Sequence, residues 1–543
     1  TVRLYGVIFI TNGVTYTPRN VDFANTESWL RRAYPIGTLN STRVNTTFPA
    51  NQGLPNCGTA NAHLAGLRAT DLNNGAIVAT TRYHGLVFQG PPLNYFMQGC
   101  CCNFGTSSGP AGSSDWGWDF DGSYADWYSA HELGHGYGQC HPGFCAGQTA
   151  DTSPHCGTYP YPNGYIGGPA NDPNRYYGMD VETLQVYGPT WADFMSYCSN
   201  LWVSDFNYRR LRNRFMNPPL VSMAPIAAEE RLMVMGSVDL ATDAVTLSPF
   251  QRMPNVTYVP EQIPGEYLIV LKDVGGGVLL EYPFTPKVQE VETNGPSCNA
   301  AGPASPTINV PAAIFELVPW RAGTARVSIY HGDRELAHRD VSPHAPSVRV
   351  VSPNGGEVIN GNAFTISWQA GDADGDPLTF TLLYSKDGGA IWQTLTMGVE
   401  GNALAVDASL LPGSASALVR VTASDGVNTT SDQSDAIFTL RRKGPQVNIT
   451  SPADNAHSAP GEIVALAGVA YDPEDGSLSG DALVWESDRD GVLGTGTSLA
   501  VPLSPGRHRV TLIATDSDNN QGTAGLTLFV GGRYYLPVTM KGR

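Results

Sequence analysis

The chain has 543 residues, of which 41% are hydrophobic and 10% aromatic, so it is too long for a single hydrophobic core and too apolar for general disorder. Its 32 Lys and Arg against 49 Asp and Glu give a formal net charge of −17, which argues against a nucleic-acid-binding protein because neutralising phosphates requires a basic face. No stretch approaches the roughly 18 consecutive apolar residues of a membrane-spanning helix.

Charge and cysteine content both change near residue 216. Residues 1–216 contain 12 Arg, no Lys and 14 acidic residues, so most of the negative charge lies in 217–543. The cysteines of the first part are Cys57, Cys100, Cys101, Cys102, Cys140, Cys145, Cys156 and Cys198, whereas the second part has only Cys298. This break predicts a domain boundary, with Asn217-Pro218-Pro219 as a linker.

The crowded cysteines have two interpretations, a disulfide-bonded secreted domain or a thiolate metal site. Cys100, Cys101 and Cys102 are contiguous and lack the C-x2-C spacing of zinc ribbons. Disulfides and a secreted, extracellular location are therefore the favoured interpretation. Nine is an odd number, so two possibilities stay open for one thiol: it is free, or it pairs with another chain.

Helices and strands alternate in the first part. Residues 2–10 are rich in β-formers, and 76–81 form a short apolar run, so both are expected to be strands. Residues 22–34 and 59–72 have helical spacing. A further helix is expected at 204–215, capped by Ser204 or Asp205, with a solvated face formed by Arg209, Arg210, Arg212 and Arg214. Residues 1–216 are thus expected to form an α+β domain.

After residue 225 the pattern changes to short alternating strands, at 232–240, 266–274 and 325–332, separated by Gly, Asn and Pro turns. The segment 348–353 recurs 99 residues later at 447–452, and Asp372, Asp374 and Asp376 recur as Asp472, Glu474 and Asp475. A period near 100 residues predicts tandem β-sandwiches. The expected all-β domains are 217–342, 343–443 and 444–534, with a tail at 535–543. They resemble the immunoglobulin-like and fibronectin-type modules of many secreted bacterial enzymes.

The strongest chemical signal is the segment His131-Glu132-Leu133-Gly134-His135-Gly136-Tyr137-Gly138-Gln139-Cys140-His141. On a helix, positions i and i+4 share a face, so His131 and His135 can present two imidazoles to one ion. Gly138 can adopt a positive φ and end the helix, so that His141 supplies a third nitrogen. Three protein ligands leave a position open for water, as in catalytic zinc sites.

This segment resembles the signature of the metzincin clan of zinc metallopeptidases, H-E-x-x-H-x-x-G-x-x-H followed by a Met-turn. Asp193-Phe194-Met195-Ser196-Tyr197-Cys198 is the Met-turn candidate. The resemblance covers about 1–215 and implies that Met195 forms an apolar floor beneath the ligands. The Met-x-Tyr spacing is similar to that of astacins and serralysins, which implies that Tyr197 binds zinc and stabilises the oxyanion.

The expected function is that of a secreted zinc endopeptidase acting on a protein or glycoprotein. Zn²⁺ on His131, His135 and His141 would activate water, with Glu132 as the general base. The β-modules would set location or bind a cell-surface or matrix polymer. The alternative is a secreted adhesion or glycan-binding protein with a structural or vestigial zinc site, although the intact Glu132 argues against it.

Other acidic and histidine side chains are weaker candidates. The repeated Asp clusters, with Asp488, Asp490, Asp516 and Asp518, offer oxygen ligands for Ca²⁺, a second candidate cofactor, but Asp with Gly is also ordinary turn chemistry. The same two interpretations apply to Asp115, Asp119, Asp121 and Asp126, for which a solvated run before the helix is favoured. Core or surface positions are expected for His63, His84 and His155.

Overall fold

The computed structural model describes residues 1–89, 99–101, 105–112, 122–145, 149–169, 171–217, 226–260, 262–288, 290–291 and 311–531. Within them, the chain divides into two compact units, Thr1–Gly178 with Gly188–Lys443 and Met179–Tyr187 with Gly444–Arg543. Several residues named above lie outside the described part of the chain: Cys102, Asp115, Asp119, Asp121, Pro218, Pro219, Cys298 and 535–543.

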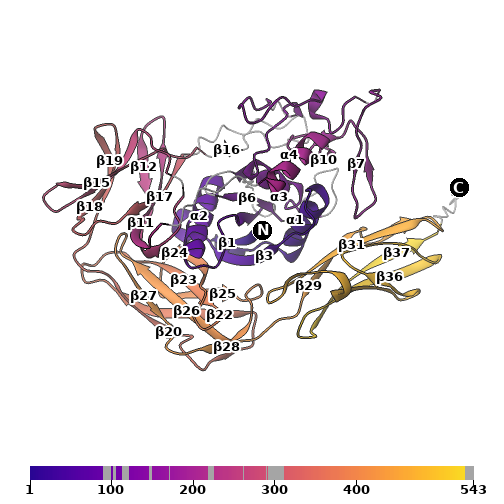
Figure 1. Cartoon of the computed structure of the whole chain (residues 1–543). Coiled ribbons are helices and arrows are strands. Elements are labelled where there is room, and N and C mark those ends of the chain that lie inside the picture. The colour runs from indigo at the N-terminus through magenta and orange to yellow at the C-terminus, as the bar shows by residue number, and fades with distance from the viewer. Residues whose placement is uncertain are drawn as a thin grey trace, which may run out of the picture. The chain divides into compact units, whose positions relative to one another are not determined.

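The N-terminal part of the first unit is built on a mostly parallel sheet (Figure 1). Its first strand is a nearly continuous apolar run that is buried on both faces, as expected for a central parallel strand. The sheet contains β1 (Val2–Thr11), β2 (Val14–Tyr16), β3 (Ser41–Thr47), β4 (Arg82–Phe88), β5 (Cys100–Cys101), β6 (Thr106–Ala111) and β16 (Glu290–Val291). Strands β3, β1, β4 and β6 are mutually parallel, whereas β5 is antiparallel to β6 and β16 antiparallel to β5.

In the described part of the chain, four α-helices accompany this sheet: α1 (Asn20–Ala33), α2 (Cys57–Asn73), α3 (Trp127–Gly136) and α4 (Asp205–Met216). Two short strand pairs complete the local elements in the described part of the chain: β7 (Gly178–Met179) with β8 (Val186–Tyr187), and β9 (Ala192–Asp193) with β10 (Leu201–Trp202). The expected α+β character of this part is confirmed, as are the strand at 2–10 and the helices at 22–34, 59–72 and 204–215. Ser204, not Asp205, caps α4, because its hydroxyl accepts the Asn207 N–H at 3.1 Å.

The prediction of a strand at 76–81 is wrong. These residues form a turn, and the next strand, β4, begins at Arg82. Val78 is 62% exposed, and the carbonyl of Thr81 accepts a hydrogen bond from the Arg68 guanidinium at 3.0 Å instead of a neighbouring strand. The apolar run therefore lies in a loop that Arg68 of α2 holds in place.

Three β-sandwiches follow. In the first, one sheet contains β12 (Ala244–Leu247), β11 (Glu229–Asp239), β13 (Gln251–Val256) and β17 (Ala312–Pro319). The facing sheet contains β15 (Val278–Phe284), β14 (Tyr267–Lys272), β18 (Arg326–His331) and β19 (Arg334–Asp340). Side chains from both sheets, including Val234, Ile269 and Ile329, form one buried core.

The second sandwich pairs a sheet of β20 (Ser347–Ser352), β22 (Ala363–Gly371) and β25 (Ala403–Asp407) with a sheet of β21 (Val358–Ile359), β28 (Phe438–Leu440), β26 (Ser414–Ser424), β23 (Thr379–Ser385), β24 (Gln393–Val399) and β27 (Thr429–Gln433). The third repeats this plan with β29 (Gln446–Ser451), β31 (Ile463–Asp472), β32 (Gly476–Leu478) and β35 (Ser498–Pro502) against β30 (Ala456–Ser458), β37 (Gln521–Val530), β36 (Gly506–Thr515), β33 (Leu483–Ser487) and β34 (Gly491–Thr495). The expected tandem all-β architecture is confirmed.

The repeat extends to the strand register. The pairing of β20 with β22 shifts between Val350 and Ser352, and that of β29 with β31 shifts at the equivalent place, between Ile449 and Ser451. A turn closed by an aspartate carboxylate lies at the end of each of the two long strands, β22 and β31.

The first two sandwiches share a core with the N-terminal domain. One buried cluster joins Leu64 and Leu67 of α2 with Phe315 of β17 and Met397 of β24, and α2 lies beside these strands in Figure 1. The approach is close, because a Cβ at Gly66 would overlap the Met397 sulfur. The N-terminal domain is therefore packed directly onto β-modules, which are more than an appended tail.

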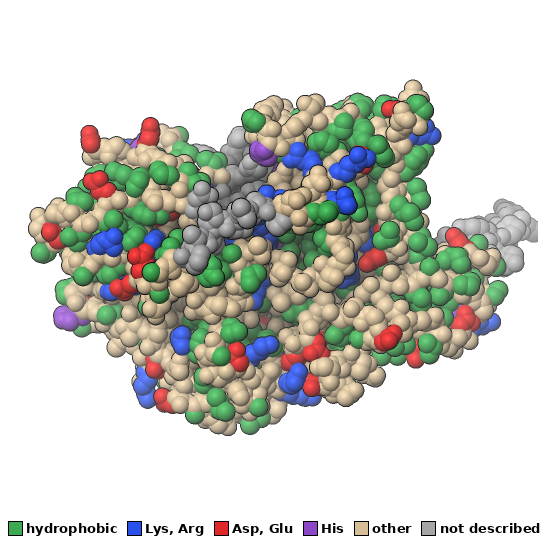
Figure 2. All heavy atoms as spheres, in the orientation of Figure 1, with side chains coloured by type: hydrophobic (Ala, Val, Ile, Leu, Met, Phe, Trp, Pro, Cys, Tyr) green, Lys and Arg blue, Asp and Glu red, His purple; other side chains and the backbone are tan. Residues whose placement is uncertain are grey.

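The surface carries mixed charge. On the face drawn in Figure 2, acidic and basic side chains are interspersed rather than gathered by sign. Among the residues that the structure describes, no helix is both long and apolar enough to cross a membrane.

Candidate metal centre

Helix α3 carries the first half of the expected ligand set. His131 and His135 lie one turn apart on it, and both side chains are buried. The helix ends at Gly136, and Gly138 has a φ of +83°, a conformation that glycine adopts without steric cost. The chain then turns and brings His141 back to the helix, as expected from the position of Gly138.

The three imidazoles converge through their Nε2 atoms. The distances are 3.1 Å between His131 and His135, 2.9 Å between His135 and His141, and 3.3 Å between His131 and His141. Ligands about 2.0–2.1 Å from a tetrahedral Zn²⁺ lie about 3.3 Å apart. The spacing of the nitrogens therefore fits a single ion of this size.

The other ring nitrogens determine the tautomers. His131 Nδ1 donates to the Phe194 carbonyl at 2.8 Å, and His135 Nδ1 donates to the Gln139 carbonyl at 3.0 Å. His141 Nδ1 lies 3.3 Å from the Asp151 carboxylate. With each Nδ1 carrying the proton, three Nε2 lone pairs face one another, an arrangement that a bound cation stabilises.

Asp151 is a supporting residue that the sequence motif does not include. Its carboxylate also accepts the backbone N–H of His141 at 2.7 Å. Burial raises the pKa of Asp151, but the hydrogen bonds from His141 outweigh this, so its pKa lies below the ordinary value. A carboxylate on the second nitrogen of a metal-binding histidine fixes the ring and increases its basicity.

Glu132 lies on the same helix, and its side chain is fully buried. Its carboxylate packs against Gly99, just before strand β5, so closely that a Cβ at Gly99 would overlap it. The glycine is needed here for close approach, and its importance could not be read from the sequence. The contact between Gly99 and Glu132 therefore joins the start of β5 to the helix that carries the metal centre.

The Met-turn candidate lies beneath α3. Met195 is fully buried, and its sulfur would be 2.8 Å from a Cβ at Gly134 of the helix. Tyr197 places its hydroxyl 3.4 Å from His141 Nε2, with its ring centroid 5.6 Å from that of His131. The structure thus brings the six expected site residues together: His131, Glu132, His135, His141, Met195 and Tyr197.

Asp193 holds this turn in place. Its buried carboxylate accepts the N–H groups of Met195 at 2.8 Å and Ser204 at 2.9 Å, and the Asn207 side-chain amide at 2.8 Å. Burial raises the pKa of Asp193, and these hydrogen bonds offset part of that rise. An Asp two residues before a turn residue is a recognisable signal for side-chain to backbone bonding, although its structural role was not predicted.

Disulfides and hydrogen bonds fix the loop that carries His141. Disulfides join Cys140 to Cys156 and Cys145 to Cys198, and a third joins Cys57 to Cys100; Cys101 is disulfide-bonded as well. The expectation of disulfides over a thiolate metal site is confirmed. Arg210 is not simply solvated as expected, because it donates to the carbonyls of Gly138 at 2.8 Å and Cys156 at 2.6 Å.

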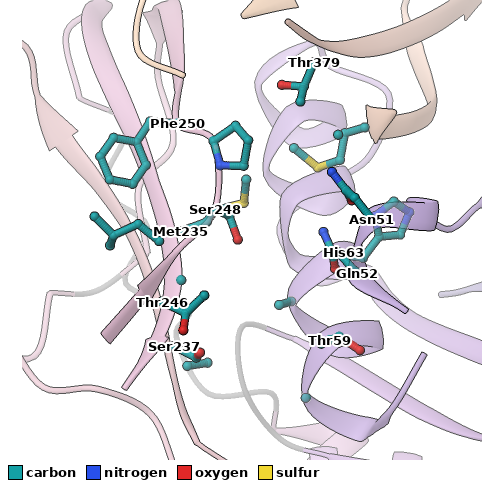
Figure 3. Close-up of a pocket in the computed structure, with 18 of the residues that line it drawn as sticks. Asn51, Gln52, Thr59, His63, Met235, Ser237, Thr246, Ser248, Phe250 and Thr379 are labelled. Atoms are coloured by element: carbon teal, nitrogen blue, oxygen red, sulfur yellow. The ribbon is translucent and has the colours of Figure 1, made fainter. Parts of the chain in front are cut away.

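Two cavities bear on function. One of about 740 Å³ opens beside His141 and Asp151 and has aromatic walls that include Tyr159, Tyr161 and Phe206. The other, of about 460 Å³, lies between α2 and the first two sandwiches. Figure 3 shows its side chains projecting from both sides, such as Thr59 and His63 opposite Ser237 and Thr246. No Asp, Glu, Lys or Arg among the described residues lines this second cavity, so the metal centre and the first cavity form the candidate active site.

The three other histidines of the N-terminal domain lie in the core or at the surface, away from the ligand set. His84 is buried between Ser107 and Ser129, at 2.8 and 3.0 Å, and burial lowers its pKa to about 3. Burial likewise lowers the pKa of His63 to about 4. His155 is exposed beside Cys140 and Cys156, whose sulfurs are used in the disulfide. Core and surface positions, as expected, account for all three.

Asp126 departs from the solvated acidic run expected before the helix. It immediately precedes α3, but it is only 1% exposed.

Comparisons with known proteins identify no family. A scan against protein-family models finds no match, and a search of curated proteins finds none. Among solved structures, the fibronectin(III)-like modules of Clostridium thermocellum CbhA are 17% identical, over 35% of this chain and 100% of theirs, with a TM-score of 0.16. Titin-A168169 is 13% identical, over 35% of this chain and 100% of its own, with a TM-score of 0.18. The tandem Ig repeats of Dlar are 14% identical, over 35% of this chain and 100% of their own, with a TM-score of 0.14. Such low TM-scores carry no argument about function.

Proposed function

We propose that the N-terminal domain is a zinc-dependent endopeptidase of the metzincin type and that the protein acts outside the cytoplasm. The observation that carries this proposal is the triangle of Nε2 atoms from His131, His135 and His141, with edges of 2.9–3.3 Å. Glu132 on the same helix and the Met195 turn beneath it are the parts that such a hydrolase needs in addition. The disulfides support the extracytoplasmic location.

In this proposal, His131, His135 and His141 hold the ion, and Asp151 keeps the His141 ring oriented. When bound, Zn²⁺ supplies a Lewis acid that polarises a carbonyl and acidifies water. The carboxylate of Glu132 takes the proton of the attacking water and delivers it to the leaving amine. The hydroxyl of Tyr197 donates to the oxyanion that develops on the scissile carbonyl.

The cavity beside His141 is where the substrate side chain next to the scissile bond would enter. Its walls include Tyr159, Tyr161 and Phe206, so bulky apolar side chains are the expected preference. The first two β-modules pack against the domain, and the modules would hold the enzyme at a surface or polymer, which sets where cleavage takes place.

The test uses the full chain with three variants and a peptide-library digest read by mass spectrometry. Glu132→Gln should retain zinc and lose at least about 10³-fold in cleavage rate, since it keeps the shape but not the base. His131→Ala should lose both zinc and cleavage, whereas the exposed His155→Ala is the matched control and should keep both. Full chelator-sensitive cleavage by Glu132→Gln would exclude it as the base. Stoichiometric zinc without cleavage of any peptide would favour an adhesion protein with a structural metal.

A further inference from the structure

The second and third sandwiches share an unusual carboxylate at the turn after their long strand. Asp372 Oδ1 accepts the N–H groups of Asp374 and Asp376 at 2.9 and 3.1 Å. One repeat later, Asp472 Oδ1 accepts those of Glu474 and Asp475 at 2.9 and 3.0 Å. One oxygen of each carboxylate therefore closes the turn, which leaves the second oxygen available.

The second oxygen is buried without a hydrogen bond. Asp372 Oδ2 and Asp472 Oδ2 are both inaccessible to solvent and accept no hydrogen bond from any residue that the structure describes. The whole Asp472 residue is 0% exposed. A buried anionic oxygen costs several kcal/mol unless a donor or a cation compensates it. Two such oxygens at equivalent positions of a repeat indicate that each turn binds a ligand of the same kind.

Further oxygens surround each turn. In the second sandwich, one carboxylate oxygen from each of Asp372, Asp374 and Asp376 lies within 4.8 Å of the others. Oxygens bound to one Ca²⁺ at 2.3–2.6 Å can be at most about 5 Å apart, so these three can share an ion. Burial raises the pKa of the nearby Asp425, and the negative charge of Asp372 adds a smaller contribution in the same direction.

In the third sandwich, a second turn meets the first. Ser517 donates from its backbone and side chain to the Asp475 carboxylate, at 2.7 and 2.9 Å. The neighbouring Asp516 is 7% exposed. Glu474 lies beside Asp472, and burial, followed by the smaller effect of the Glu474 charge, raises the pKa of Asp472 to about 6. Carboxylates thus gather where two turns come together in both modules.

From these observations we infer that each of the two C-terminal sandwiches binds one Ca²⁺, through Asp372 with Asp374 and Asp376 in the second and through Asp472 with Glu474 in the third. The hard oxygen donors favour Ca²⁺ over zinc. The ion would neutralise the buried oxygen and join the turn to its neighbour. This inference is independent of the peptidase activity, since none of these residues contributes to the His131 site.

The test is calorimetric titration of the full chain with CaCl₂ after treatment with a calcium-selective chelator in a zinc-buffered solution. Asp372→Asn and Asp472→Asn keep the Oδ1 acceptor but put an amide in place of the second oxygen. Each variant should bind one Ca²⁺ fewer than the unaltered chain. The matched control is Asp490→Asn, since both oxygens of Asp490 already accept hydrogen bonds from Ser504 at 2.6 and 2.9 Å; it should bind the same number as the unaltered chain.

Thermal unfolding of the unaltered chain provides a second measurement that does not depend on the variants folding. Calcium at about 1 mM should raise the melting temperature, because binding to the native state alone stabilises it, and the same concentration of MgCl₂ should raise it less. Unchanged stoichiometry in either Asn variant overturns the inference. Absence of any calcium effect on melting also overturns it, as does a larger effect of magnesium.

Discussion

The buried carboxylate of Asp71 on α2 accepts the backbone N–H of Thr394 on β24 at 2.6 Å. The two residues are 323 positions apart, one in the N-terminal domain and the other in the second sandwich. The other oxygen of Asp71 accepts from Arg3 and Tyr83, both at 2.6 Å. One charge therefore completes the N-terminal core and also attaches a β-module to it.

We predict that Asp71→Asn lowers the free energy of unfolding by about 3–5 kcal/mol, since it leaves the buried guanidinium of Arg3 without its counter-charge. Urea denaturation of the full chain measures this change. The control is Glu400→Gln, which alters the exposed contact with Asn51 between the same two domains and should cost less than about 0.5 kcal/mol. Equal unfolding midpoints for Asp71→Asn and the unaltered chain would contradict the prediction.

The parts of the site that could be predicted from the sequence are those fixed by local geometry. His131 and His135 share a face because four residues make about one helical turn. Gly138, three residues after His135, lets the chain turn away from the end of the helix because glycine adopts a positive φ without steric cost. The same local reasoning predicted α1, α2 and a cap at Ser204 or Asp205, of which the structure has Ser204. Period-2 patterns and a 100-residue repeat likewise predicted the β-modules.

The remainder depends on contacts between distant positions. Asp151 supports His141 from across a loop, and Gly99, just before β5, lies against Glu132 of α3. No spacing rule connects such pairs, because tertiary packing alone sets their distance. The segment 76–81 failed for a related reason: its composition suits a strand, but Arg68 occupies the Thr81 carbonyl that a strand would use.

Asp151→Asn should weaken zinc binding about 10–100-fold, because it removes the charge that orients and polarises His141. Competition with a chromogenic chelator at constant pH measures the affinity. Asp172→Asn, in the same domain but at a turn bonded to Asn174, is the matched control and should leave the affinity unchanged. If both variants bind zinc equally well, Asp151 does not act through His141.

Tyr197→Phe should lower kcat about 10²-fold and change KM by less than about threefold, since an oxyanion donor acts in the transition state. Its hydroxyl is 3.4 Å from His141 Nε2, so zinc content is determined alongside the kinetics. Tyr208→Phe on α4, 41% exposed, should behave as the unaltered enzyme. A loss of zinc with normal turnover per bound ion would instead make Tyr197 a ligand without a catalytic role.

Glu316 in the first sandwich should make stability depend on pH. Burial raises its pKa from 4.5 to about 7, partly offset by Lys287 and Tyr282. The folded state holds a proton that the unfolded chain releases, so this stabilisation is present below pH 4.5 and is lost as pH rises to about 7. Relative to the unaltered chain, Glu316→Gln should gain about 2–3 kcal/mol between pH 4.5 and 8.

Urea midpoints at several pH values, compared with those of the exposed Glu281→Gln, measure that gain. The two variants should diverge steadily over this range and run parallel above about pH 8. A constant difference across the range would mean that Glu316 does not titrate there.

Gly99→Ala should separate the general base from the metal ligands. A Cβ at position 99 would overlap the Glu132 carboxylate, and the buried side chain of Glu132 must then move away from its position on α3. Because the atoms nearest to a Cβ at position 99 belong to Glu132 and not to an imidazole, zinc content should stay the same while kcat falls at least about tenfold. Gly136→Ala on α3 meets open space and should retain activity, with a small gain in helix stability. Equal kcat values for the two alanine variants would show that the Glu132 carboxylate tolerates displacement, and the assignment of this residue as the proton carrier would then be wrong.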